Sequence, residues 1–385
     1  MQTHRAETRE FIISSSSMCH NSVRRRATAG PRGWRFDMLR FSLLLAAAIA
    51  PLASFGLAQE GPYKVLKTDK TGGDGGFDYV YADSDGRRLY VPRTGPSARI
   101  AVYNLDTLEP QGEIPKANAR GAAVDPKSHH GFGSSKPVVM WDTKTLKTIK
   151  TIEVEGHPDG ILFDPFNQRV WVFSHSQPNA TIIDAKDGAV AGTLDLGGAP
   201  EQAVTDGKGH IFVDLEDKDQ IAAVDAAALK VTAHYELAGR GGGPGGLAFD
   251  VKNHILFATC HSPATMVILK SDDGKILDAL PIGNGTDGAT FNTRTMEAFS
   301  SNGDGTLTVI KENNPAGFTV EQNLKTMPRA KTLTLDTKTN HILLIAAEYG
   351  PPPAPPADAA KEAPRRGSGR GPMLPGSFSI LVVGK

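Results

Sequence analysis

The chain has 385 residues, of which 39% are hydrophobic, so it carries enough apolar side chain to bury a sizeable core. Lys and Arg equal Asp and Glu at 42 each. Without residues 1–58, which hold eight Arg and three acids, the balance becomes 34 basic to 39 acidic side chains, a net charge of −5. That balance argues against a general electrostatic attraction to nucleic acid or anionic lipid.

The first 58 residues have the layout of an export signal. Residues 1–37 form a polar, Arg-rich leader, and we take Met38 as the true start of translation. Residues 38–58 follow the pattern of a secretory signal peptide, with an apolar run that ends in small residues at Ala58. A membrane anchor is the alternative, but Pro51 breaks the run, which is short for a bilayer span of about 20 residues. The sequence therefore predicts a periplasmic or secreted protein with no membrane span after cleavage.

The chain has two cysteines, and only one lies beyond the signal segment. Cys19 falls in the leader, which leaves Cys260 alone. A single cysteine forms no internal disulfide and no cysteine-based metal site. Because Cys260 ends an apolar, strand-like run, we expect it to be a buried structural thiol.

A seven-fold repeat dominates residues 59–385. In each unit a short apolar run ends in Asp or Asn and is followed by a turn and a second apolar run. The repeat ends are spaced by 42, 39, 42, 44, 42 and 44 positions: Asp83, Asp125, Asp164, Asp206, Asp250, Asn292 and Asp336. A period of about 40–45 residues with several short strands per unit is typical of a propeller. The sequence therefore predicts an all-β fold, a single seven-bladed β-propeller with four-stranded blades.

The ends of the chain predict how the ring closes. The seventh unit lacks a fourth strand, whereas a spare strand at 63–67 precedes the first unit. We expect this strand to pair with the C-terminal strand at 377–383, because closure removes an exposed sheet edge. The Pro/Gly-rich segment 350–376 breaks the repeat. It is predicted to be a disordered or polyproline-like loop inserted between the second and third strands of the seventh blade.

Four sequence pieces carry a resemblance to a known family: Arg87–Val91, Asn104–Leu108, Trp141–Leu146 and Gly156–Asp159. They resemble the YVTN repeat, and residues 61–385 as a whole look like the bacterial YncE-like propellers. The resemblance implies a seven-bladed propeller that is exported to the periplasm or the cell exterior. It implies no reaction, because the repeat motif is structural, and so no catalytic residue is carried over.

Seven equivalent positions point to the mouth of the central channel. They lie five residues before each repeat end: Asp78, Arg120, Asp159, Glu201, Gly245, Asp287 and Lys331. Six of them are ionisable, and a glycine follows at four positions, which suits inner strands that crowd together near the axis. Their four acids and two bases give a formal charge of −2. Crowded carboxylates raise one another's pKa or recruit a cation, so we predict a binding site at this mouth.

A second set of candidates lies in the loops expected on the same face. It comprises Arg93, His157, His175, Glu216, Asp217, His261, Asn302, Asp304, Arg329 and Glu348. A divalent cation is a possible ligand, with Asp159, Glu201 and His157 as its candidate ligands. The alternative is that these charges only form salt bridges, such as Asp159 with Arg120, and line a water-filled space.

Two functions of different classes fit these residues. The first is a binding or scaffold module, expected to be a monomer, whose charged mouth holds a protein partner or a small molecule. The alternative is a metal-assisted lactonase or lyase, in which Asp159, Glu201 or His157 would move protons. The alternative rests on analogy with other propellers. We favour the first, because the sequence shows no catalytic constellation, and nucleic acid is disfavoured by the negative balance.

Overall fold

The computed structural model describes residues 61–237, 239–352 and 371–385. All of them fall within one compact unit, Phe55–Lys385. The predicted leader and signal peptide lie outside the described residues, as do residues 353–370 of the predicted loop insertion. The described residues form strands and turns, and no helix among them is long and apolar enough to cross a membrane.

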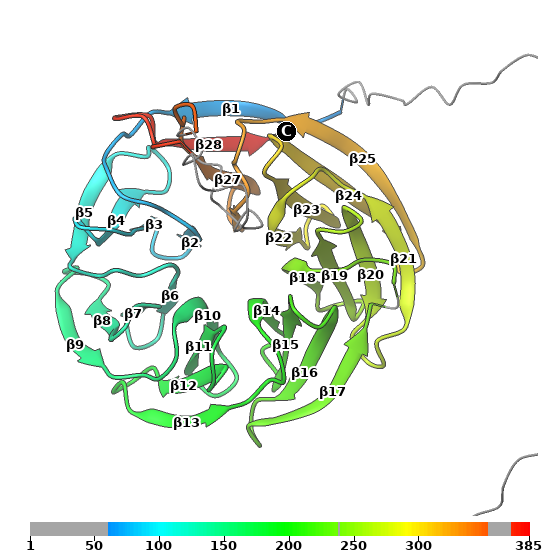
Figure 1. The fold of residues 1–385 in the computed structure, drawn as a ribbon, viewed down its shortest axis with the longest axis horizontal. Coiled ribbons are helices and arrows are strands. Elements are labelled where there is room, and N and C mark those ends of the chain that lie inside the picture. The colour runs from blue at the N-terminus through cyan, green and yellow to red at the C-terminus, as the bar shows by residue number, and fades with distance from the viewer. Residues whose placement is uncertain (1–60, 238, 353–370) are drawn as a thin grey trace, which may run out of the picture. The chain divides into compact units, whose positions relative to one another are not determined.

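Seven antiparallel four-stranded sheets stand around a central axis and form the predicted seven-bladed propeller (Figure 1). From the axis outwards, blade 1 comprises β2 (Tyr81–Asp83), β3 (Arg88–Arg93), β4 (Arg99–Asn104) and β5 (Pro110–Pro115). Blade 2 comprises β6 (Ala122–Asp125), β7 (His130–Gly133), β8 (Val138–Asp142) and β9 (Thr148–Ile152). Blade 3 comprises β10 (Pro158–Asp164), β11 (Arg169–Ser174), β12 (Ala180–Asp184) and β13 (Val190–Leu194).

Blade 4 comprises β14 (Pro200–Thr205), β15 (His210–Leu215), β16 (Gln220–Asp225) and β17 (Lys230–Glu236). Blade 5 comprises β18 (Pro244–Asp250), β19 (Ile255–Cys260), β20 (Thr265–Lys270) and β21 (Ile276–Pro281). Blade 6 comprises β22 (Thr286–Asn292), β23 (Glu297–Asn302), β24 (Thr306–Asn314) and β25 (Gly317–Lys325). Blade 7 comprises β26 (Leu333–Asp336), β27 (His341–Ala346), β28 (Ser379–Gly384) and β1 (Lys64–Asp69).

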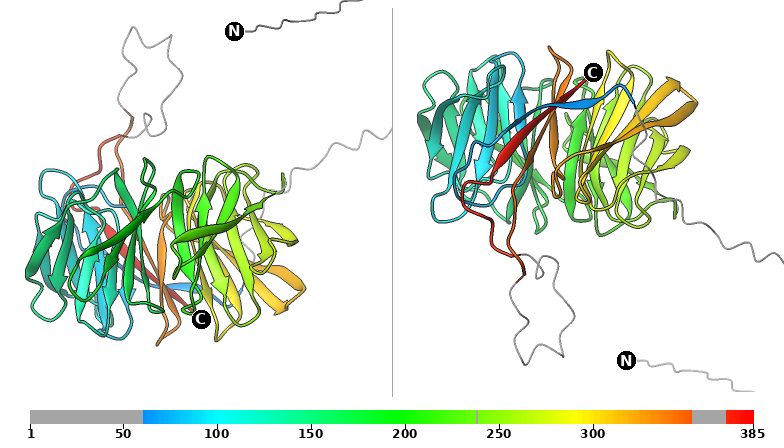
Figure 2. Two further views of the ribbon diagram at one scale, coloured as in Figure 1. Left: turned by 90° about the horizontal axis from the view of Figure 1, so that it is seen from below. Right: turned by 90° about the horizontal axis from the view of Figure 1, so that it is seen from above.

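The seventh blade is completed by the N-terminal strand, as predicted. Its strand order is β1-β28-β27-β26, and β1 pairs antiparallel with β28, with Thr68 opposite Leu381 and Asp69 opposite Ile380. Figure 2 shows the two strands, blue and red, side by side in this blade. The two ends of the fold therefore share one sheet, and each of the seven blades has four strands.

The Asp or Asn at each repeat end ties down the turn that follows the inner strand. Asp125 Oδ1 accepts a hydrogen bond from the backbone N of Lys127 at 2.9 Å, and Asp250 Oδ1 accepts one from Lys252 N at 3.0 Å. Short polar side chains that accept from the backbone two residues on are typical of turns. The repeat seen in the sequence is thus the turn signal of the fold, which explains its regular spacing.

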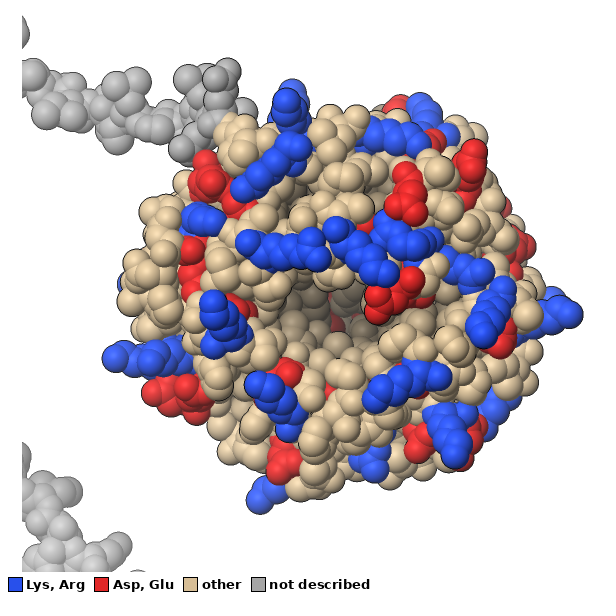
Figure 3. Space-filling model, turned by 180° about the vertical axis from the view of Figure 1, so that it is seen from behind, with Lys and Arg blue, Asp and Glu red and all other residues tan. Residues whose placement is uncertain are grey.

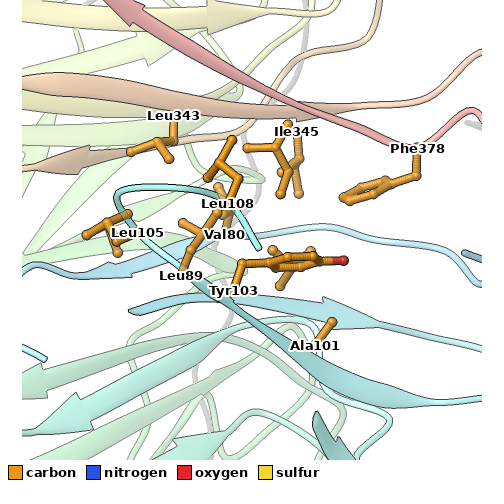
Figure 4. Close-up of a cluster of buried hydrophobic side chains, with 12 residues drawn as sticks. Val80, Leu89, Ala101, Tyr103, Leu105, Leu108, Leu343, Ile345 and Phe378 are labelled. Carbon is orange, nitrogen blue, oxygen red and sulfur yellow. The ribbon is translucent and has the colours of Figure 1, made fainter. Parts of the chain in front are cut away.

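Neighbouring blades share their hydrophobic cores. Between blades 7 and 1, Leu343 and Ile345 of β27 pack in one buried cluster with Leu89 of β3 and Tyr103 of β4 (Figure 4). Phe378, just before β28, belongs to the same cluster. Each fully buried side chain of this size contributes about 1.5–3 kcal/mol. The junction where the chain ends meet is therefore closed by apolar packing as well as by strand pairing.

Glycines let the inner strands approach one another. A Cβ at Gly160 would lie 2.5 Å from the backbone O of Glu201, and one at Gly246 would lie 2.8 Å from the backbone N of Ala289. Neither position has room for a side chain. The structure thus supports the interpretation that small residues follow the charged positions because the strands crowd near the axis.

Candidate functional site at the channel mouth

The upper face of the propeller is the face that carries the loops between blades and the loops between second and third strands. The charged residues predicted at the starts of the inner strands meet there in a chain of contacts. Arg120 Nη1 lies 2.9 Å from Asp78 Oδ2, and Arg120 Nε lies 3.8 Å from Asp159 Oδ1. On the other side, Lys331 Nζ lies 3.8 Å from Asp78 and donates a hydrogen bond to Asp287. Positive and negative side chains therefore alternate along this part of the mouth.

His175 extends the chain of contacts into the next blade. It follows β11 directly, and its Nε2 lies 3.1 Å from Glu201 Oε1 and 3.6 Å from Asp159 Oδ2. Tyr79, which the sequence reasoning did not name as a site residue, brings its hydroxyl to 3.2 Å from Glu201 Oε2. The sequence did mark Tyr79 in one respect: it follows Asp78 at a position where four of the seven units have glycine. These contacts hold the Glu201 carboxylate between two donors.

Of the seven equivalent mouth positions, Gly245 is the one without a side chain, and the imidazole of His261 lies next to it. A Cβ at Gly245 would lie 3.0 Å from His261 Nε2, so the imidazole fills the space that a side chain there would need. His261 follows β19, and its Nε2 also lies 4.0 Å from Glu216 Oε1. The sequence placed both residues on this face but gave no sign that His261 would take the place of the seventh side chain.

The surroundings at the mouth raise the pKa of three side chains, Asp159, Asp287 and His175. Burial, with Asp78 and Glu201 nearby, raises the pKa of Asp159 to about 6, against the opposing effect of Arg120 and His175. Burial likewise raises the pKa of Asp287 to about 6, although Lys331 opposes it. The hydrogen bond to Glu201 raises the pKa of His175 to about 9, which favours its imidazolium form at neutral pH.

Three of these side chains could hold a metal ion. In the part of the chain that the structure describes, Asp159, His175 and Glu201 form a group whose ligand atoms all lie within 4.8 Å of one another. His157, which the sequence put forward with Asp159 and Glu201, is not in this group, and its Nδ1 lies 3.0 Å from Ser176 Oγ. One imidazole and two carboxylates are a donor set that suits Zn²⁺ and similar transition-metal ions.

Two cavities flank the charged residues. One, of about 320 Å³, opens beside the mouth and is lined by Asp78, Arg120 and His157 among others. The second, of about 390 Å³, lies in the channel between the inner strands, and Tyr79 and Glu201 contribute to its wall. Together they provide space for a ligand on both sides of the charged contacts.

Other predicted residues have different surroundings. Arg93 is buried, with its guanidinium 3.9 Å from the centre of the Phe378 ring, and it donates to the backbone O of Gly75 at 3.0 Å. This arginine therefore joins blade 1 to blade 7 rather than lining the mouth.

Arg329 and Glu348 also have partners away from the charged contacts. The Arg329 guanidinium stacks 4.5 Å over Tyr349, and Glu348 pairs with Lys70 at 3.1 Å. Asp217 pairs with Lys218, and Asp304 and Asn302 hydrogen-bond within and around the turn between β23 and β24. The structure thus brings together only part of the second set of candidates.

Comparisons with known proteins give the fold but no family. No family model and no curated protein matches the sequence. Among solved structures, the chain is similar to the WD40 repeats of RRP9, with a TM-score of 0.62 and 8% identity over 84% of this chain and 99% of that one. A chain of a mitotic checkpoint complex gives 0.63 and 11% over 80% and 96%, and U3-55K gives 0.63 and 8% over 83% and 98%. Such low identities show the shared propeller fold alone.

Proposed function

We propose that this protein is an exported, YncE-like propeller that works as a binding module, holding a small molecule or a segment of a partner protein at its channel mouth. The observation that carries the proposal is the run of alternating charges from Glu201 through His175, Asp159 and Arg120 to Asp78. Arg120 and His175 are 53% and 40% exposed, so both can exchange an internal partner for a ligand.

The scaffold supports this role in physical terms. Asp159, Glu201 and Asp287 lie on inner strands, so their positions are fixed by the sheets, and Asp78 lies three residues before β2. The adjoining cavities leave room for a ligand. A rigid site loses little conformational entropy on binding. One of the fold neighbours was solved in a mitotic checkpoint complex, an assembly in which that propeller takes part.

The test is capture by the immobilised protein from an extract of the exporting organism. We expect Arg120→Gln and Glu201→Gln each to lose the captured partner, because each removes one charge from the mouth without changing side-chain size much. Lys144→Gln, an exposed site on the opposite face, is the matched control and should capture as well as the unmodified protein. Undiminished capture by both mouth variants would exclude the mouth as the binding site.

A second candidate function is a metal-assisted lactonase or lyase, and the grouping of Asp159, His175 and Glu201 favours it. A metal held there would polarise a carbonyl, while Arg120 would be near enough to Asp159 to attract an anionic substrate. The test is equilibrium dialysis with Zn²⁺ followed by a lactone and lyase screen. We expect one bound Zn²⁺ per chain that is lost in His175→Asn and kept in His157→Asn; equal binding by both variants would place the ion elsewhere.

A further inference from the structure

The lower face of the propeller carries a collar of cations around the other end of the channel. We define the collar as the residue two positions after the repeat end in five of the seven blades: Lys127, Lys208, Lys252, Arg294 and Lys338. All five are exposed. Because they occupy equivalent turns in different blades, they lie around the axis on one face, and Figure 3 shows Lys and Arg side chains standing around the hollow at its centre.

The acids of these turns lie beneath the collar. Asp125, Asp250 and Asp336 are at most 2% exposed, and their oxygens accept hydrogen bonds from the backbone N of Lys127, Lys252 and Lys338. The exposed acid of these turns, Asp85, pairs with Lys338 at 3.0 Å. A surface that touches this face therefore meets ammonium and guanidinium groups first. At physiological ionic strength, screening over about 8 Å makes the outermost charges dominant.

The remaining turns of the lower face do not cancel the collar. Between third and fourth strands, the exposed charges comprise four Lys and five acids: Lys144, Lys147, Lys186, Lys275, Asp106, Glu109, Asp187, Asp272 and Asp273. Two more exposed Lys, Lys230 and Lys270, lie at the strand ends beside these turns. The excess of exposed positive charge on this face therefore belongs to the inner turns. The whole-chain charge balance missed it, because a sum over all residues also counts the buried turn acids and the acidic mouth.

Exposed apolar side chains accompany the collar. Phe166 takes the collar position in blade 3 and is 44% exposed. Ile149 and Val190, near the starts of the outer strands β9 and β13, are 47% and 48% exposed and lie toward the same face of the adjoining blades 2 and 3. Cations combined with exposed aromatic and aliphatic side chains on one face are the pattern of proteins that lie on a membrane surface.

We infer that the lower face docks on an anionic lipid bilayer, with the collar against the headgroups and Phe166 inserted at the interface. A ring of cations on one face meets a planar surface all at once, whereas a linear polyanion such as nucleic acid would follow a stripe and reach only part of the ring. Docking through this face leaves the mouth on the upper face open to its ligand, so the inference does not depend on the function proposed for the mouth.

Vesicle co-sedimentation of the protein purified after export tests the inference. The vesicles are phosphatidylcholine alone, or phosphatidylcholine with about a third phosphatidylglycerol, at about 0.15 M salt. We expect preferential binding to the anionic vesicles that weakens as salt is raised. The triple variant Lys127→Gln/Lys208→Gln/Lys252→Gln should bind roughly 100-fold more weakly, since each Lys near an anionic surface is worth about fivefold. Phe166→Ser should weaken binding without changing its salt dependence.

The matched control removes the same charge from the upper face, where Lys116, Lys218 and Lys325 are also exposed. The triple variant of these residues to Gln should bind vesicles like the unmodified protein. If the collar triple fails to fold by circular dichroism, the three single variants replace it, each with a loss of about fivefold. Equal binding to both kinds of vesicle, or equal losses in the two triples, would overturn the inference. So would tighter, collar-dependent binding to a single-stranded oligonucleotide, which would assign the face to nucleic acid instead.

Discussion

Arg87 of blade 1 and Asp336 of blade 7 form a two-pronged ion pair across the junction where the ring closes. Arg87 Nη1 and Nη2 donate to Asp336 Oδ1 and Oδ2 at 2.8 and 2.9 Å, and the carboxylate is 2% exposed. Planar, paired hydrogen bonds of this kind are specific to Arg and are stronger than those between neutral groups. The pair therefore joins the last inner strand to the first blade on the lower side of the ring.

Replacing Arg87 should destabilise the propeller. Arg87→Met leaves the Asp336 carboxylate buried without its cation, and we expect a loss of about 2 kcal/mol in the free energy of unfolding. Urea titration followed by tryptophan fluorescence measures it. Arg88→Met is the control, since Arg88 donates a long 3.4 Å hydrogen bond to Lys144 O and lies beside the Tyr90 hydroxyl rather than bridging to a carboxylate of blade 7. Equal losses in the two variants would mean that the ion pair contributes nothing specific.

The same pair predicts how stability changes with acid. The Arg87 hydrogen bonds, with donors from Thr339 and Lys338, hold the pKa of Asp336 well below its usual range. A depressed carboxyl pKa adds stability that is fully present above the unfolded pKa of about 3.9 and is lost as pH falls toward the folded pKa. The stability difference between Arg87→Met and the unmodified protein should therefore stay constant from pH 8 to 5 and shrink below about pH 4. A difference that shrinks near pH 6 instead would point to another group.

Asp287 at the mouth should affect stability in the opposite sense to Asp336, because its ionised form destabilises the fold. Its pKa is raised to about 6, chiefly by burial, so ionising it in the folded state costs stability as pH rises from about 4 to above 6. Asp287→Asn removes that cost, and its effect on the free energy of unfolding should be more favourable at pH 8 than at pH 4 by about 2 kcal/mol. Urea titrations at both pH values measure the change. Asp85→Asn, at a 77% exposed carboxylate of the lower face, is the matched control.

Cys260 should be inert in the folded protein. Its side chain is fully buried, and burial raises the pKa of its thiol to about 12, so almost no thiolate is present at neutral pH. In a chain of residues 59–385, where Cys260 is the single cysteine, we expect a thiol reagent such as dithionitrobenzoate to react with one thiol after denaturation and to react negligibly before it. Rapid reaction of the native protein would show that β19 opens readily.

The sequence could predict the blades and the charged positions because both follow from local pattern. Repeat ends such as Asp125 are turn residues, and small residues such as Gly160 mark the crowded inner strands, so their spacing alone places Asp159 at the mouth. The sequence could not show which histidine, His157 or His175, joins Asp159 and Glu201, since both lie in loops of the same face. The choice depends on loop conformation, in which His157 contacts Ser176 while His175 joins Asp159 and Glu201.

Contacts between distant parts of the chain were also invisible in the sequence. Tyr63, before the closing strand, donates its hydroxyl hydrogen bond to Glu297 of β23, 234 positions later, and the Nζ of the C-terminal Lys385 lies 2.7 Å from the same carboxylate. Nothing local marks these three residues as partners, because only closure of the ring brings both chain ends against blade 6. The contacts of Tyr63 and Lys385 with Glu297 are therefore known only from the structure.

The hydrogen bond from Tyr63 to Glu297 should stabilise the folded protein. Glu297 is fully buried, and Gln322 pairs with both the backbone N and O of Tyr63 at 2.9 Å, so the Tyr63 hydroxyl is held against the carboxylate. Tyr63→Phe removes one donor and keeps the ring that packs on Phe299, so we expect a loss of about 1–3 kcal/mol in the free energy of unfolding. Tyr103→Phe, in the core between blades 7 and 1, is the matched control and should change it by much less. If denaturant titration gives the two variants the same stability, the hydroxyl of Tyr63 does not hold the closing strand, and apolar packing and strand pairing alone close the ring.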